Sequence, residues 1–163
     1  MSYFIGSFVP KPTADIFWKN RPLIDKVRWV KSERYHITFR YFDELNAGEL
    51  STVLDLTEKF ANQFPIRCQT KMYSGFPSSQ RARVIIVPLV LEEFSLPPEL
   101  RTKKPFVPHV TVGYARQGRV TVPQHPVQSS FILEKPVLIH SEKGTYTFVR
   151  EKVANSNCVT KNS

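Results

Sequence analysis

The pattern of apolar and polar positions along the chain predicts mostly short strands. Residues 3–9 and 35–42 are rich in aromatic and β-branched side chains, which are typical of strands. The same signal recurs in residues 26–30, 66–73, 83–89, 107–115, 119–122, 129–138 and 145–152. The sequence therefore predicts a strand-rich fold with few helices.

Helical spacing of apolar residues is confined to a few segments. It is clearest over residues 47–62, where leucine, valine and phenylalanine recur after Asn46, a favourable helix cap. A shorter helix is expected over residues 14–20, with Thr13 as its cap. Two consecutive prolines within residues 91–104 leave room there for one or two helical turns at most.

One short sequence motif occurs in each half of the chain. The sequence HITF at residues 36–39 is matched by HVTV at residues 109–112. Alternate side chains of a strand share a face, so each histidine and its threonine point the same way. In the first strand Arg40 should join that polar face, while Tyr41 should lie on the opposite, apolar face. Two similar lobes facing each other are the expected arrangement.

The residue types in these two motifs suit acid–base chemistry. A neutral imidazole accepts a proton near neutral pH, and an imidazolium donates one, so two histidines can act as base and acid. Threonine hydroxyls can donate hydrogen bonds to phosphoryl oxygens. A single His-x-Thr usually marks a half-buried histidine, but two of the four histidines carry it. His125 and His140 lack the pattern and are assigned no role.

Composition and charge narrow the partners. The 163 residues suit one domain, and their net charge of +9 favours anionic partners such as nucleic acid, nucleotides or a membrane surface. No glycine-rich phosphate loop and no metal-ligand spacing of His, Asp and Glu is present, so we expect no metal and no cofactor. Cys68 and Cys158 are expected to be free thiols. With no signal peptide or membrane span visible, a cytoplasmic protein is expected.

The sequence resembles a known superfamily in two blocks. The first consists of VRWV at residues 27–30 followed by YHITF at 35–39, and the second is PFVPHVTV at 105–112. Both blocks resemble the 2H phosphoesterases, most closely the LigT-like RNA 2′,3′-cyclic phosphodiesterases, first known as 2′-5′ RNA ligases. YFIG at 3–6 and GTY at 144–146 also fit.

This resemblance implies an α+β fold of two pseudo-symmetric lobes. Each lobe would carry an antiparallel sheet facing a central cleft, with helices outside. A single bilobal domain is expected over residues 1–152, followed by a polar, disordered tail over residues 153–163. The implied protein is a monomer that needs no obligate protein partner, membrane or cofactor.

The resemblance also implies roles for the motif residues. His36 would protonate the leaving 3′-oxygen, and His109 would deprotonate the attacking water. Thr38 and Thr111 would bind the phosphoryl oxygens. The implied reaction opens the 2′,3′-cyclic phosphate end of an RNA, or a cyclic nucleotide, to a 2′-phosphomonoester, with 2′-5′ ligation as its reverse.

Further candidates surround these four residues. Tyr114 stands where the family usually has arginine, and Arg40 and Arg116 are the candidate arginines for the phosphate. Basic residues that could attract RNA are Lys71, Arg81, Arg83, Arg101, Lys103 and Lys104. Four aromatic residues could stack on a base, although packing in the core is the favoured interpretation: Tyr41, Tyr73, Phe76 and Phe106.

Three functions stay open at this point. The first is the cyclic phosphodiesterase described above. The second keeps the site but takes 2′-5′ oligonucleotides or cyclic-nucleotide signals as substrates. The third is an RNA-end-binding protein without turnover.

Overall fold

A computed structural model describes residues 2–149 and 159–161 of the chain. The two α-helices in this part are α1 (Lys11–Lys19) and α2 (Ala47–Phe60). The strands up to the middle of the chain are β1 (Ser2–Phe8), β2 (Val27–Trp29), β3 (His36–Phe42), β4 (Ile66–Met72), β5 (Ser74–Phe76) and β6 (Val84–Pro88). The later strands are β7 (Val90–Leu91), β8 (His109–Ala115), β9 (Pro126–Leu133), β10 (Val137–Glu142), β11 (Thr145–Val149) and β12 (Val159–Lys161).

Strands β3 and β8, which carry the two His-x-Thr motifs, lie next to each other. They connect the two halves of a sheet with the order β12-β11-β10-β1-β3-β8-β6-β5, and β2 pairs with residues 113–115 of β8, beyond the point where β3 meets it. β3 and β8 meet in antiparallel register at the single pair Ile37–Val110. One half of the sheet therefore ends on β3 and the other begins on β8. This arrangement brings the two motifs together from segments about 70 residues apart.

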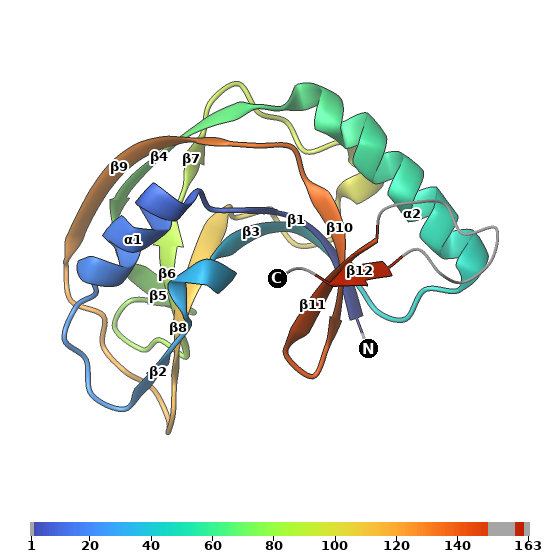
Figure 1. The fold of residues 1–163 in the computed structure, drawn as a ribbon. Helices are drawn as coiled ribbons and strands as arrows, with labels where there is room; N and C mark the ends of the chain where they lie inside the picture. Colours follow the sequence, from blue (N-terminus) through green and yellow to red (C-terminus); the bar gives the residue numbers. More distant parts are fainter. Residues whose placement is uncertain (1, 150–158, 162–163) are drawn as a thin grey trace.

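The helices lie on the outside of the strands (Figure 1). α1 lies beside β9, and α2 lies beside β10. A second sheet, β7-β4-β9, completes the fold. The apolar sides of the two motif strands enter the core, where Ile37, Phe39, Val110 and Val112 are buried. The polar sides of the same strands are thereby free to line a cavity. The predicted α+β fold, with strands inside and helices outside, is confirmed.

The helix predictions are confirmed for α2 and in part for α1. Asn46 caps α2 in a capping box with Glu49, as the sequence indicates. α1 starts earlier than predicted, with Pro10 at the N-cap, and Thr13 is a buried residue within it. The missing N–H of Pro12 costs nothing in the first turn, so the prolines start this helix and do not exclude it.

Two strand predictions differ from the structure. Residues 119–122 form no strand, and the segment makes only an isolated bridge between Ala82 and Val120. Residues 129–138 are divided between β9 and β10, because Glu134, Lys135 and Pro136 interrupt the pairing. The proline in this interruption has no N–H for a ladder.

The C-terminal prediction lies mostly outside the described residues. Within the segment 153–163, only Val159–Lys161 is described, and there β12 pairs with β11. Cys158 also lies outside the described residues. Cys68 is a buried free thiol whose pKa burial raises to about 12. In the described part of the chain no helix is long and apolar enough to span a bilayer.

Candidate active site

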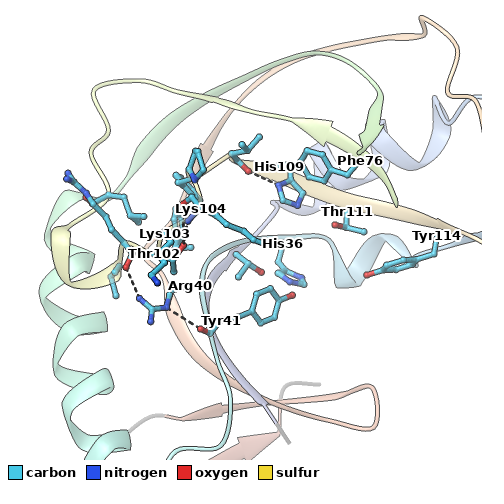
Figure 2. Close-up of a pocket in the computed structure, with 18 of the residues that line it drawn as sticks. His36, Arg40, Tyr41, Phe76, Thr102, Lys103, Lys104, His109, Thr111 and Tyr114 are labelled. Carbon is cyan, nitrogen blue, oxygen red and sulfur yellow. Dashed lines mark hydrogen bonds between the residues drawn. The ribbon is translucent and has the colours of Figure 1, made fainter. Parts of the chain in front are cut away.

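The four motif residues line one cavity. Figure 2 labels three of them, His36, His109 and Thr111. His36 and Thr38 reach it from β3, and His109 and Thr111 from β8. The cavity has a volume of about 910 Å³, which is large enough for a nucleotide. The prediction that these side chains share a polar surface agrees with this placement.

Both imidazoles are held in the same way. Nδ1 of His36 lies 2.8 Å from the carbonyl oxygen of Arg34, and Nδ1 of His109 lies 2.7 Å from that of Val107. A carbonyl oxygen only accepts, so Nδ1 must be the donor in each ring. The neutral tautomer therefore leaves the Nε2 lone pair of each histidine free to take a proton.

The two rings differ in their packing. The ring of His36 stacks on Phe4 at 4.7 Å between centroids and meets Tyr146 edge-on at 5.7 Å. The ring of His109 meets Phe76 edge-on at 4.8 Å. These contacts fix both imidazole planes, although His36 is the more enclosed ring.

Burial shifts both histidines toward the neutral form. It is the main cause that lowers the pKa of His36, and the carbonyl of Arg34 opposes it through the hydrogen bond. The positive charges of Arg34 and of protonated His109 lower the pKa of His36 further. Burial also lowers the pKa of His109, against its own carbonyl hydrogen bond. Each protonated ring disfavours protonation of the other, so the pair favours states with at most one proton.

Tyr41 lies on the cavity side, and the predicted orientation is wrong. The pairing of β3 with β1 shifts after Thr38, which makes Phe39 an extra residue in the strand. Such a bulge interrupts the alternation of faces. Tyr41 pairs with Phe4, the residue whose ring supports His36, and so it shares the face of the motif.

The predicted arginines behave differently from each other. Arg40 lines the cavity, but its guanidinium donates to the backbone carbonyls of Tyr41 and Arg101. It thus ties β3 to the segment that carries Lys103 and Lys104. Arg116 is not among the residues that line the cavity, since it follows the end of β8, where its backbone N–H donates to the carbonyl of Lys26.

Figure 2 shows Arg40, Lys103 and Lys104 together at one end of the cavity. Arg101 also lines the cavity, and its carbonyl accepts from Arg40. The other three basic candidates, Lys71, Arg81 and Arg83, do not line it. Of the aromatic candidates, Tyr73 is in the core, where its hydroxyl donates to the carbonyl of Phe17. Phe76 and Phe106 line the cavity, and Phe106 also packs against Phe39.

Two residues near the site were not predicted as site residues. Tyr146 lines the cavity from β11, and the guanidinium of Arg34 lies 4.1 Å from its ring centroid while it donates to the carbonyl of Gly144. The family resemblance of residues 144–146 is the one sequence signal that points to Tyr146. Among residues 2–149, no group of three or more His, Cys, Asp or Glu side chains is arranged to hold a metal ion.

Comparison with solved structures shows which known proteins have a similar fold. TT0787 of Thermus thermophilus superposes with a TM-score of 0.76 at 24% identity, over 92% of this chain and 96% of that chain. E. coli LigT complexed with 3′-AMP gives a TM-score of 0.60 at 18% identity, over 91% of this chain and 94% of that one. The chain has the LigT-like 2H phosphoesterase fold.

The predicted LigT-like architecture is thereby confirmed. A further neighbour, described only as a phosphoesterase, has a TM-score of 0.55 at 17% identity, over 90% of this chain and 93% of its own. No protein-family model matches the chain, and no curated protein sequence matches it significantly. The likeness therefore rests on the arrangement of the strands and helices.

Proposed function

We propose that the protein hydrolyses 2′,3′-cyclic phosphate ends of RNA to 2′-phosphomonoesters, with His36 as proton donor and His109 as proton acceptor. The observation that carries this proposal is the matched anchoring of the two imidazoles. Each Nδ1–H is committed to a backbone carbonyl, and both rings line the same cavity. Two free Nε2 atoms on either side of a bound phosphate are what an acid–base pair requires.

The reaction then proceeds by in-line displacement at phosphorus. Nε2 of neutral His109 takes a proton from water as the water oxygen forms its bond to phosphorus. The bond between phosphorus and the 3′-oxygen breaks, and Nε2–H of protonated His36 gives its proton to that oxygen. The products are a 2′-phosphomonoester and a free 3′-hydroxyl, and the pair ends with its two protonation states exchanged.

The substrate itself prepares the acid. In the free protein, burial holds the pKa of both histidines below the usual range. A phosphate anion between the rings favours the protonated form of the nearer imidazole and so raises its pKa. The hydroxyls of Thr38 and Thr111 line the same space and can donate to the phosphoryl oxygens as charge builds on them.

The structural neighbours support a nucleotide ligand. E. coli LigT has been crystallised with ATP, with NADP+ and with 3′-AMP. Each of these ligands joins a phosphate to a nucleoside. We carry this ligand class over to the cavity between β3 and β8, whose volume and basic end suit it.

One assay separates this function from its competitors. The protein is incubated in EDTA with 2′,3′-cyclic AMP, with an RNA ending in a 2′,3′-cyclic phosphate, and with a 2′-5′-linked oligonucleotide. We expect the two cyclic phosphates to yield 2′-phosphates. Cleavage of the 2′-5′ linkage alone would favour the oligonucleotide function, and tight binding of the RNA end without any product would favour the binding protein. A mainly 3′-phosphate product would reverse the roles given to the leaving group.

A further inference from the structure

The two most exposed aromatic side chains in the described part of the chain both lie in the cavity. Tyr41 is 62% exposed and Tyr114 is 38% exposed, whereas every other described aromatic side chain is buried or half-buried. Exposed rings contribute little to the stability of a core. Two of them in one cavity, beside a pair of histidines, point to a ligand that covers them.

The same local device directs both rings into the cavity. In β8 the pairing with β6 shifts between Thr111 and Gly113, so that Val112 is an extra residue. This bulge comes directly after the His-x-Thr motif, at the place that Phe39 occupies in β3. In each strand the tyrosine five residues after the histidine therefore returns to the face of the motif.

The two tyrosines belong to one cluster with Tyr146. Burial is the main cause that raises the pKa of Tyr114, and the nearby Tyr41 and Tyr146 raise it further. Burial also raises the pKa of Tyr146, so Tyr114 and Tyr146 present neutral phenols to an anionic ligand. Figure 2 shows the side chains of Tyr41 and Tyr114 extending into the cavity on the side of His36.

A cation lies over one of these rings. The guanidinium of Arg28 lies 4.9 Å from the ring centroid of Tyr114, because Arg28 and Tyr114 are paired across β2 and β8. The basic end of the cavity, with Lys103 and Lys104, is built from a different segment. The cavity thus offers both aromatic faces and positive charges to its ligand.

We propose that Tyr41 and Tyr114 form the subsite that holds the base of the nucleotide whose phosphate lies between the histidines. The proposal deepens the function proposed above, since it specifies how the nucleoside part of that ligand is bound. The contact is stacking on the tyrosine rings, which accepts any base because every base has a π-face. A phosphate without a base lacks this contact and binds more weakly.

Binding of the product tests this subsite without requiring turnover. Calorimetry measures the dissociation constants of adenosine 2′-monophosphate and of inorganic phosphate for the wild type and for variants. Tyr41→Leu and Tyr114→Leu remove the rings, Tyr41→Phe and Tyr114→Phe keep them, and circular dichroism checks folding. Ile132→Ala is the matched control, because Ile132 is an exposed apolar residue on β9 that does not line the cavity.

We expect each leucine variant to raise the dissociation constant of adenosine 2′-monophosphate about tenfold, which is the effect of losing one stacked base contact. Phosphate binding should be unchanged, and the phenylalanine variants and the control should match the wild type. The proposed subsite is contradicted if the leucine variants bind the nucleotide as tightly as the wild type does. It is also contradicted if their affinity for phosphate falls by the same factor, or if the phenylalanine variants lose as much affinity for the nucleotide as the leucine variants do. Wild-type protein that binds the nucleotide no better than phosphate also overturns it. A protein that binds in the expected pattern but hydrolyses nothing would contradict the proposed function alone.

Discussion

His36 and His109 have the same backbone anchor but different surroundings. Both rings commit Nδ1–H to the carbonyl two residues earlier. Only His36 also carries the electrostatic effect of Arg34 and a stacked ring beneath it. The two rings therefore share an anchor but not an electrostatic environment. The additional effects lower the pKa of His36, so this ring depends on the bound phosphate anion to hold the proton that it donates.

The pH dependence follows from the direction of these shifts. The pair works with one proton, so activity falls when both rings are protonated at low pH and when both are neutral at high pH. Because burial lowers both pKa values in the free protein, kcat/KM should be greatest below about pH 6.5, the ordinary value for histidine. The kcat profile should lie at higher pH, because the bound anion raises the pKa of the acid.

Steady-state rates on 2′,3′-cyclic AMP between about pH 4.5 and pH 8.5, a range of about 2 pH units on each side of that value, check this expectation. A kcat/KM maximum well above pH 7, or identical profiles for the two parameters, would contradict it.

At this scale the sequence predicted the residues that alternation alone can place. His36, Thr38, His109 and Thr111 lie within two residues of one another in each strand, before the bulges intervene. Arg116 could not be placed, because it follows Ala115, the predicted and observed end of β8, and alternation assigns no face beyond the end of a strand.

At the scale of elements, the bulges in β3 and β8 limit how well side-chain orientation can be predicted from the sequence. A single extra residue in a strand has no reliable sequence signature, yet it changes which face the following side chains occupy. The predicted orientation of Tyr41 was wrong for this reason. By contrast, the start of α2 has a local signal in the sequence, and Asn46 was correctly predicted as its cap.

A substitution at Gly6 tests whether the close contact between β1 and β3 positions the site. A Cβ on Gly6 would lie 2.6 Å from the backbone oxygen of Ile37, the residue between His36 and Thr38. Gly6→Ala should therefore displace β3, lower the free energy of unfolding by about 2 kcal/mol, as overpacking typically does, and reduce kcat. Urea denaturation and steady-state rates measure both effects.

Gly48→Ala is the matched control, because its Cβ would meet only the Asn46 side chain at 3.5 Å. It lies in α2, so it should raise stability by about 0.5 kcal/mol and leave kcat unchanged. Wild-type stability and activity in Gly6→Ala would show that the contact between β1 and β3 does not position the site.

Over the whole molecule, part of the basic charge behind the net charge of +9 lies where it can meet substrate. Arg40, Arg101, Lys103 and Lys104 line one end of the cavity. The sequence could predict an anionic partner from the total charge, but it could not show which of the basic residues would line the site. That depends on the path of residues 101–106, which the tether from Arg40 to the carbonyl of Arg101 helps to set.

The lysines should matter more for RNA than for a mononucleotide. Lys103→Gln with Lys104→Gln lowers the net charge from +9 to +7 and should raise KM for a cyclic-phosphate-ended RNA while reducing its salt dependence. KM for 2′,3′-cyclic AMP should change less. The control is Lys19→Gln with Lys135→Gln, which loses the same charge from exposed positions outside the cavity. Equal effects of the two double variants would mean that total charge, and not this segment, attracts RNA.

The pairing of His36 and His109 is tested most directly by single-turnover rates across pH for the wild type, His36→Asn and His109→Asn. Asparagine can still donate to the carbonyl that anchors Nδ1, and circular dichroism confirms folding. We expect a bell-shaped profile for the wild type and a loss of at least about a hundredfold in each variant, the low end for a positioned acid or base. His36→Asn should keep only the limb in which the base loses its proton, and His109→Asn only the limb in which the acid loses its own. Near-wild-type rates, or an intact bell in either folded variant, would contradict the two-histidine mechanism.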